Sequence, residues 1–330
     1  MTYILGVDAG NTKTIALVAR TDGTVLGSGR ASCGDIYGAG HPDRALAQVD
    51  LAVGRALDAA GTRPEDLEAG AFSMAGADWP EDFALLEGAA RERGLGRRVA
   101  VYNDAIGALR AGAPEGWGVV VACGTAAAVG ARGRDGRIWH SSFWQEHGGG
   151  DHLGEKALRA MMRAELGVDP PTLLTERALE LLGMPSVAAL LHARTRRELS
   201  EDERPDIGRL GRVLLDAAAD GDATARRIVV EHGAALGDDA LAAARQVGLE
   251  HEDFPLVLAG GVLRHPSPML RDALVARVLE RAPGAVPTRI RLEPAAGAVL
   301  LALELAGVTV TPALLERLEP SLPPASFFAT

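Results

Sequence analysis

The first part of the chain contains short apolar segments separated by polar turns, a pattern that predicts β-strands. Three strands are predicted at 3–7, 14–19 and 24–29. The pair Asp22-Gly23 between the last two is a typical hairpin turn. The same unit occurs again later, with strands predicted at 117–122, 126–131 and 137–142 and an Asp-Gly pair at 135–136. A repeated unit of this kind indicates two domains with the same fold.

Between and after these units the apolar spacing is that of helices alternating with buried strands. Helices are predicted at 42–60, 81–93, 105–111, 153–166, 173–182, 187–199, 207–219, 223–247, 269–279 and 295–306. Further strands are predicted at 69–74, 98–102, 255–259 and 289–293. Strands that alternate with helices of this length indicate an α/β fold whose sheets contain parallel pairs.

The length of the chain also favours two domains. Its 330 residues, 47% of them hydrophobic, can bury two cores of ordinary size. We expect an N-terminal domain at 1–113 and a C-terminal domain with a helical elaboration at 114–309. The polar segment 194–206 is expected to form a surface loop. Two arrangements are open for the tail: segment 310–330 either joins the first domain or is loosely held at its end.

Charge and composition exclude several partners. The formal net charge is −10 and no long basic stretch occurs, so neither nucleic acid nor an anionic membrane is an expected partner. The chain has no long apolar run and its start lacks the features of a signal peptide, so we expect a cytoplasmic protein. Cys33 and Cys123 are far apart in the sequence, which predicts no disulfide framework and no metal cluster within one chain.

The turn after the first predicted strand contains candidate phosphate ligands. Asp8 ends the strand, and Gly10, Asn11, Thr12 and Lys13 follow it. A tight turn of small residues can direct several backbone N–H groups at a phosphate, with hydroxyl groups and one lysine added. The Asp8 carboxylate could hold Mg²⁺, which usually keeps much of its water shell. The alternative is a plain hairpin, because short glycine motifs often match by chance.

Two further glycine turns strengthen the phosphate interpretation. Gly124 and Thr125 occupy the matching point of the repeated unit, so two hairpin turns could approach one polyphosphate from two domains. Gly260 and Gly261 follow a predicted strand and precede a helix, where bare backbone could accommodate a purine and its ribose.

These turns, in this order, resemble the acetate and sugar kinase/heat-shock-protein-70/actin superfamily. Within it the chain resembles the family that contains eukaryotic-type N-acetylglucosamine kinase and the BadF/BadG/BcrA/BcrD ATPases, over nearly its whole length. Residues 6–14 resemble the first phosphate loop of that family, Gly124-Thr125 the second and Gly260-Gly261 the adenosine motif. Gly221 lies in a segment that resembles a nucleotide-contacting turn, and residues 294–298 resemble the start of the closing helix.

The resemblance implies an α/β protein with two ribonuclease-H-like (actin/hexokinase-like) domains and an ATP cleft between them. It implies ATP and Mg²⁺ as cofactors, a small sugar as substrate and a homodimer. The expected reaction is transfer of the γ-phosphate to a hydroxyl of N-acetylglucosamine or a related amino sugar.

The expected catalytic residue is Asp104, which follows Asn103 at the end of a predicted strand and the start of a helix. A carboxylate there could accept the proton of a substrate hydroxyl as its oxygen attacks the γ-phosphorus. Asp104 also matches the catalytic base of the family. The alternative is that Asp104 only caps the helix, a common role for Asp.

The resemblance places the substrate contacts at Asp35, Ser73, Gly76, Asp78, Asn103, Asp104, Glu146 and Gly149. The sugar kinases generally have Asn where this chain has Asp35, an exchange that removes an amide donor and adds a negative charge. Glu146 lies near the position of another acid of the family. Because an extra acid favours a free amine, glucosamine competes with N-acetylglucosamine as the acceptor.

Four alternative functions differ in the residues that they require. Some family members couple ATP hydrolysis to electron transfer through an iron–sulfur cluster, which needs at least two well-placed thiolates per subunit. A nucleotide-dependent sensor without an acceptor is also compatible with an ATP cleft. A hydrolase with Ser73 as nucleophile lacks the flanking glycines, and a dinucleotide dehydrogenase lacks GxGxxG.

Two histidines and a lysine near residue 150 are expected to have no catalytic or metal-binding role. His147 and His152 flank three glycines, a spacing that is not typical of metal ligands, so we expect loop histidines. Lys156 is one of only two lysines in the chain, and we expect it to be a solvated surface residue.

Overall fold

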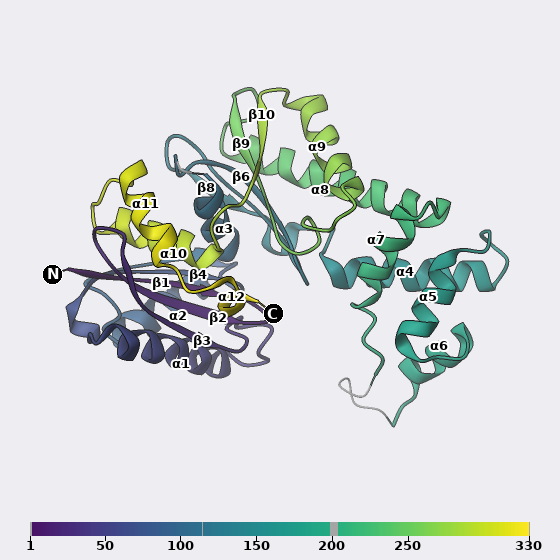
Figure 1. Ribbon diagram of the computed structural model, residues 1–330, viewed down its shortest axis with the longest axis horizontal. Helices are drawn as coiled ribbons and strands as arrows, with labels where there is room; N and C mark the ends of the chain where they lie inside the picture. The colour runs from purple at the N-terminus through teal and green to yellow at the C-terminus, as the bar shows by residue number, and fades with distance from the viewer. Residues whose placement is uncertain (1, 114, 199–203, 330) are drawn as a thin grey trace.

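The structure is a computed structural model that describes residues 2–113, 115–198 and 204–329. It contains two five-stranded mixed sheets with helices on both faces (Figure 1). The strands are β1 (Tyr3–Ala9), β2 (Thr14–Arg20), β3 (Val25–Ala31), β4 (Leu67–Met74), β5 (Arg98–Asn103), β6 (Gly118–Cys123), β7 (Ala127–Arg132), β8 (Ile138–His140), β9 (Phe254–Ala259) and β10 (Ala285–Arg289). The α/β fold with two sheets expected from the sequence is confirmed.

The two sheets have the same topology. The first has the order β3-β2-β1-β4-β5, and the second, taken from the opposite edge, has the order β8-β7-β6-β9-β10. In each sheet the three strands of the hairpin unit pair antiparallel, and the two later strands pair parallel. The duplication predicted from the repeated hairpin pattern is therefore present in the fold.

The helices connect and cover these sheets. They are α1 (Pro42–Ala60), α2 (Pro80–Glu92), α3 (Asp104–Gly112), α4 (Gly150–Glu165), α5 (Leu173–Leu182), α6 (Val187–Thr195), α7 (Leu210–Ala219), α8 (Ala223–Gln246), α9 (Met269–Arg281), α10 (Pro294–Leu305), α11 (Pro312–Ser321) and α12 (Ala325–Phe328). Two short 3₁₀ helices are η1 (Pro64–Asp66) and η2 (Ser142–Trp144).

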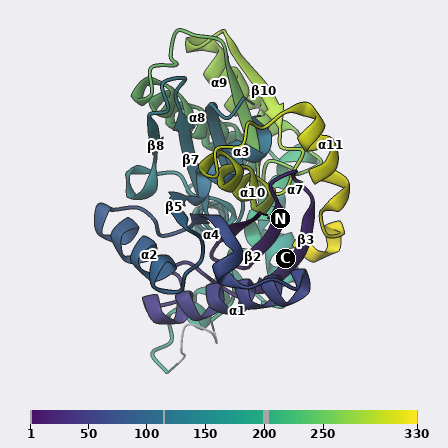
Figure 2. The same ribbon diagram turned by 90° about the vertical axis from the view of Figure 1, so that its left-hand side faces the viewer.

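The first sheet has a core on each face. Successive strand side chains point to opposite faces, so Leu5 and Val7 of β1 pack with α1 while Ile4 packs with α10. Figures 1 and 2 show α1 and α2 on one side of this sheet and α10 and α11 on the other. Asp8, which follows Val7, therefore lies on the α10 side of the sheet.

The last helix of each unit packs against the sheet of the other unit. Ala105 and Leu109 of α3 belong to one buried cluster with Val120 of β6 and Val257 of β9. In the same way, α10 packs on β1 and β4 of the first sheet. The two helices thus cross between the sheets, and each contributes to both halves of the protein.

A close glycine contact and a group of ion pairs stabilise the crossing of α3 and α10. A Cβ added to Gly297 of α10 would overlap the backbone carbonyl oxygen of Gly107 in α3, so the helix backbones touch. At the C-terminal ends of these helices, Glu304 of α10 accepts hydrogen bonds from Arg110 of α3 at 2.7 Å and from Arg132 of β7 at 2.9 Å. This ion-pair group ties both helices to the second sheet.

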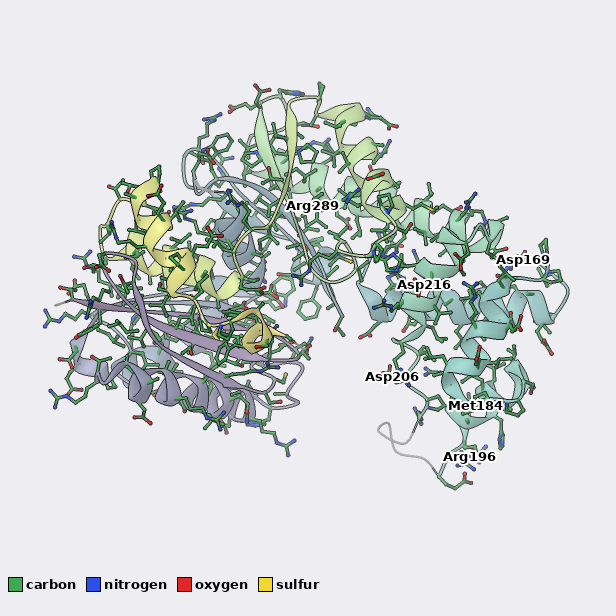
Figure 3. All side chains as sticks on the ribbon, viewed as in Figure 1. Asp169, Met184, Arg196, Asp206, Asp216 and Arg289 are labelled. Carbon is green, nitrogen blue, oxygen red and sulfur yellow. The ribbon has the colours of Figure 1, made fainter. Side chains whose placement is uncertain are left out.

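The helices α4 to α7 form an extension beside the second sheet (Figure 1). Met184 and Arg196 lie at its far end (Figure 3). Asp216 of α7 is bound by His265 Nε2 at 3.0 Å, which links the extension to the loop after β9. The segment 194–206, expected to be a surface loop, lies partly outside the described residues.

One predicted strand is wrong. The last strand was expected at 289–293 and is instead β10, because its residues pair with β9 from Ala285 opposite Phe254 to Arg289 opposite Leu258. Beyond Arg289 the chain leaves the sheet, and residues 290–293 line the cavity described below.

The tail packs on the first sheet. Leu314 and Leu318 of α11 and Phe328 of α12 are buried in the same cluster as Ile4. Of the two arrangements left open for the tail, packing on the first domain is the one observed. The domain bounds at 113 and 309 stay a prediction, and α10 packs with the first sheet although it was assigned to the second domain.

The contact between Gly297 and Gly107 generates a stability prediction. Gly297→Ala should lower the free energy of unfolding by about 1–3 kcal/mol, because the new methyl group must push two backbones apart. Gly54→Ala in α1 is the matched control: within the described part of the chain a Cβ there meets no heavy atom within 4 Å. That control should raise stability by about 0.5–1 kcal/mol. Urea unfolding of both variants checks the prediction, and equal effects would contradict it.

Candidate active site between the two sheets

A cavity of about 560 Å³ lies between the two sheets. It is lined by the first hairpin turn, the second hairpin turn, the N-terminus of α3 and the segment before α10. Sequence-predicted site residues that line it are Asp8, Gly10, Asn11, Thr12, Lys13, Asp35, Gly76, Asp78, Asn103, Asp104, Gly124, Thr125 and Gly260. Residues predicted to bind phosphate, to bind substrate and to act as the base therefore meet in one cavity.

The two hairpin turns close in the same way. The backbone N–H of Gly10 donates to Lys13 O at 2.9 Å, and that of Gly124 donates to Ala126 O at 2.9 Å. Both turns lie at the end of the first hairpin of their sheet, and Thr12 and Thr125 both line the cavity. The fold thus brings two equivalent turns to one cavity from opposite sheets.

Gly260 is required by the backbone at the end of β9. Its φ is 93°, in the left-handed region that favours glycine. A Cβ there would also overlap the backbone of Cys123, the last residue of β6. Gly260 therefore allows the chain after β9 to pass directly against the second hairpin turn.

At the start of α3, the N-cap position is occupied by the residue before Asp104. The N-cap residue is Asn103, whose Oδ1 accepts from Ala105 N at 3.1 Å. The Nδ2 of Asn103 donates to Asp78 Oδ1 at 2.9 Å. Asp104 is the first residue of the helix and lines the cavity. The N-cap of this helix is therefore Asn103, although the Asp104 carboxylate also accepts from the backbone N–H of Ala105, which lowers its pKa. The catalytic role of Asp104 stays a prediction.

Ser73, expected to contact the substrate, supports α3 from behind. Its hydroxyl is fully buried, accepts from Gly107 N at 3.0 Å and lies 3.3 Å from Asp104 O. The side chain of a strand residue points to one face only, and at Ser73 this face is towards α3. The serine therefore holds the helix that carries Asp104 and does not line the cavity.

Carboxylates gather around Asp104 in the cavity. Burial, together with the charges of Asp78 and Asp35, raises the pKa of Asp104 to about 6. Burial also raises the pKa of Asp78. Next to them, burial raises the pKa of Asp8 to about 7, with the Asp104 charge adding to the shift. A nearby cation would stabilise the ionised form of each of these acids.

The cationic side of the cavity involves the tail. Burial lowers the pKa of Lys13, while the charges of Glu293 and Asp8 act in the opposite direction. The Lys13 ammonium donates to the backbone oxygen of Phe328 in α12. Glu293 and Phe328 both line the cavity and were missed by sequence reasoning. Glu293 could have been found from the sequence, because it directly precedes the segment 294–298 that resembles the family.

A contact between the two halves closes one edge of the cavity. Ser142, at the start of η2, has a φ of 45° and donates from Oγ to Asp78 Oδ1 at 2.7 Å. The ring of Phe143 stacks on Trp79, with centroids 6.0 Å apart, and meets the edge of Tyr37 at 5.3 Å. Sequence reasoning missed this contact because its aromatic residues come from three separate loops.

Four more predicted residues lie away from the cavity lining. Gly221 forms the turn between α7 and α8 with a φ of 101°. Gly261 follows Gly260 and does not line the cavity. Gly149 packs behind the second hairpin turn, where a Cβ would overlap the oxygens of Gly124 and Ala126. Glu146 lies near Lys156, whose ammonium it stabilises, and not beside Asp104.

No helix in the ranges given above is long and apolar enough to cross a membrane. Among the same residues, no group of three or more His, Cys, Asp or Glu side chains is arranged to hold a metal ion.

The duplicated sheets, the crossed helices and the shared cavity define a two-domain protein of the actin/hexokinase-like fold. Residues 5–302 match the model of the BadF/BadG/BcrA/BcrD ATPase family. The chain belongs to this family, as the motifs of the sequence predicted.

Two relatives are similar over most of the chain. N-acetyl-D-glucosamine kinase of Dictyostelium discoideum is 28% identical over 314 residues, which are 91% of this chain and 97% of that protein. N-acetylmuramic acid/N-acetylglucosamine kinase of Clostridium acetobutylicum is 27% identical over 269 residues, 80% of this chain and 87% of that protein.

Solved structures share the fold. A candidate N-acetylglucosamine kinase from Chromobacterium violaceum has a TM-score of 0.65 at 24% identity. A ROK family glucokinase from Streptomyces griseus, in complex with glucose and AMPPNP, has a TM-score of 0.57 at 19% identity. Each likeness covers 92% of this chain and 99% of the other chain. These structures confirm the predicted fold class.

The buried carboxylates generate a prediction about pH. The pKa of Asp8 is raised from 3.8 to about 7, so its ionisation opposes folding and stability is lost as pH rises through this interval. Asp8→Asn should therefore raise the Tm of the ligand-free protein at pH 8 and change it little at pH 4. Thermal unfolding at both pH values measures the effect. Exposed Asp58→Asn is the control and should act equally at both, whereas a lower Tm of Asp8→Asn at pH 8 would contradict the prediction.

Proposed function

We propose that the protein is a cytoplasmic ATP-dependent kinase that transfers the γ-phosphate to a hydroxyl of N-acetylglucosamine or a related amino sugar. The observation that carries this proposal is the buried Asp104 carboxylate at the start of α3, in one cavity with two opposed glycine turns. The names of the two relatives that cover most of the chain support the sugar substrate. The homodimer expected from the resemblance stays a prediction.

The two hairpin turns would bind the triphosphate. Backbone N–H groups of tight turns and the hydroxyls of Thr12 and Thr125 are suitable donors to phosphate oxygens. Lys13 adds a positive charge on the side of the first sheet. Gly260, which lines the cavity, would leave space for the adenosine because it carries no side chain.

Asp104 would act as the general base. A carboxylate with a pKa of about 6 is ionised at neutral pH and has a higher proton affinity than an ordinary aspartate. It could therefore accept the proton of the acceptor hydroxyl as the oxygen attacks the γ-phosphorus, while ADP leaves on the side of the glycine turns. Asn103 would orient this reaction by holding Asp78 and the first turn of α3.

The residues of the cavity fit a Mg²⁺ ion. Asp8 is a buried carboxylate whose pKa is raised by burial and by Asp104, so a divalent cation beside it would stabilise its ionised form. Magnesium sites of phosphotransferases use one or two carboxylates together with phosphate oxygens and water. When bound there, the ion would supply positive charge that offsets the charge of the phosphates.

A free amine is a second candidate for the acceptor group. Asp35 is 7% exposed, lines the cavity and accepts from Tyr37 N at 2.9 Å through Oδ1. Its charge is near enough to Asp104 to raise the pKa of that group. A carboxylate in this position favours the ammonium group of glucosamine over an acetamido group.

The electron-transfer alternative is disfavoured by the cysteines. Cys123 is fully buried, and burial raises the pKa of its thiol to about 12. Ligands of an iron–sulfur cluster are thiolates, and a thiol in this environment does not ionise near neutral pH.

Asp104→Asn should reduce phosphate transfer about 100-fold or more, because the variant removes the proton acceptor. Its affinity for AMPPNP should stay within about threefold of the original protein, since the glycine turns are unchanged. ADP release is measured with N-acetylglucosamine, N-acetylmuramic acid, glucosamine and without acceptor. Unchanged turnover of the variant would refute the role of Asp104, and ADP release that no sugar stimulates would favour an ATPase or a sensor.

Asp35→Asn tests the acceptor. The change removes one charge at the acceptor end, so the ratio of kcat/KM for glucosamine to that for N-acetylglucosamine should fall about tenfold. Asp58→Asn, on the exposed side of α1, should leave this ratio unchanged. An unchanged ratio in Asp35→Asn would exclude the preference for an amine.

A further inference from the structure

The backbone N–H and carbonyl groups of Gly148 each contact a histidine side chain. Its N–H donates to His152 Nδ1 at 2.8 Å, and its oxygen lies 3.0 Å from His232 Nε2. His232 comes from α8 and is 0% exposed, while His152 belongs to the first turn of α4. The expectation that His152 is a loop residue is wrong, because α4 begins at Gly150.

Lys156 determines which ring nitrogen of His232 carries the proton. Its ammonium lies 2.9 Å from His232 Nδ1. An ammonium group has only donors, so Nδ1 of His232 must accept, and the ring proton is then on Nε2, which donates to Gly148. Burial lowers the pKa of His232 to about 3 and lowers that of His152, in agreement with two neutral rings. Lys156 is half-buried and bonded, so the expectation of a solvated surface lysine is wrong.

The residues that follow Gly148 hold the second hairpin turn. Gly150 N donates to Gly124 O at 2.7 Å, and Asp151 N donates to Thr125 O at 3.1 Å. Gly149 lies so close that a Cβ would overlap the oxygens of Gly124 and Ala126. The first N–H groups of α4 therefore bind the carbonyl groups of the turn, while Thr125 lines the cavity.

These contacts form a continuous connection from α8 to the cavity. Lys156 bonds to His232, His232 to Gly148, and the next two glycines to the second hairpin turn. Neither Lys156 nor His232 lines the cavity, and the nearest link is a backbone segment without side chains. A glycine segment has little stiffness of its own, so its position depends on the groups that hold Gly148.

We propose that His232 and Lys156 are positioning residues for nucleotide binding: through Gly148 they hold the second hairpin turn in the geometry that binds the ATP phosphates. This inference rests on the proposed function only as far as ATP binding is concerned, and it does not depend on the acceptor. A turn that is free to move must be ordered by the nucleotide, which reduces the affinity.

Two variants test the connection. Lys156→Met keeps the length of the side chain and removes the bond to His232, and His232→Leu removes both bonds of the ring. Affinity for AMPPNP, measured by calorimetry without any sugar, should fall about tenfold in each, the effect of one or two buried hydrogen bonds. His232→Gln, which can still donate to Gly148, should restore most of the affinity. In kinetics, KM for ATP should rise while KM for the sugar stays unchanged.

Arg159→Met is the matched control, because Arg159 is exposed and lies one turn further along α4. Its affinity for AMPPNP should equal that of the original protein. Unchanged affinity in folded Lys156→Met would overturn the proposal, as would an equal rise of both KM values. If the original protein binds AMPPNP but phosphorylates no sugar, the proposed function fails while the connection can still be tested.

Discussion

The crossing of α3 and α10 is the contact on which the cavity depends. Each helix ends one of the two duplicated units and packs on the sheet of the other, and Gly107 and Gly297 allow their backbones to touch. Asp104 begins α3 and Glu293 directly precedes α10, so this contact sets the positions of charged groups from both halves. A change in the crossing would move both ends of the cavity together.

The charges of the cavity work against the stability of the empty protein. Several carboxylates are buried close together, and burial raises the pKa values of Asp8 and Asp104 towards neutral pH. A protein that only needed to fold would pair or expose such groups. Their arrangement fits a site that becomes favourable when cations and a reacting hydroxyl group are present, with Asn103 and not Asp104 at the N-cap position of α3.

Among the described residues, the helical extension contributes no side chain to the cavity lining and reaches the second hairpin turn through the backbone of α4. The N-terminus of α4 binds the second hairpin turn, and His232 of α8 holds the glycine before it. The two halves also meet at η2, where Ser142 and Phe143 reach Asp78 and Trp79. The second hairpin turn and the loop that carries Asp78 are therefore held by different elements.

The features that sequence alone determined are local. Alternating apolar positions and Asp-Gly turns predicted the duplicated hairpins. Polar residues near strand ends, such as Asp8 and Asn103, were predicted as site residues and line the cavity, because these signals lie within a few neighbouring residues. Tertiary structure decided whatever depends on distant partners. β10 begins at Ala285 because it pairs with β9, and Lys156 is bonded because α8 brings His232 to it. Such contacts join residues far apart in the chain, and local patterns carry no information about which distant residue will be the partner.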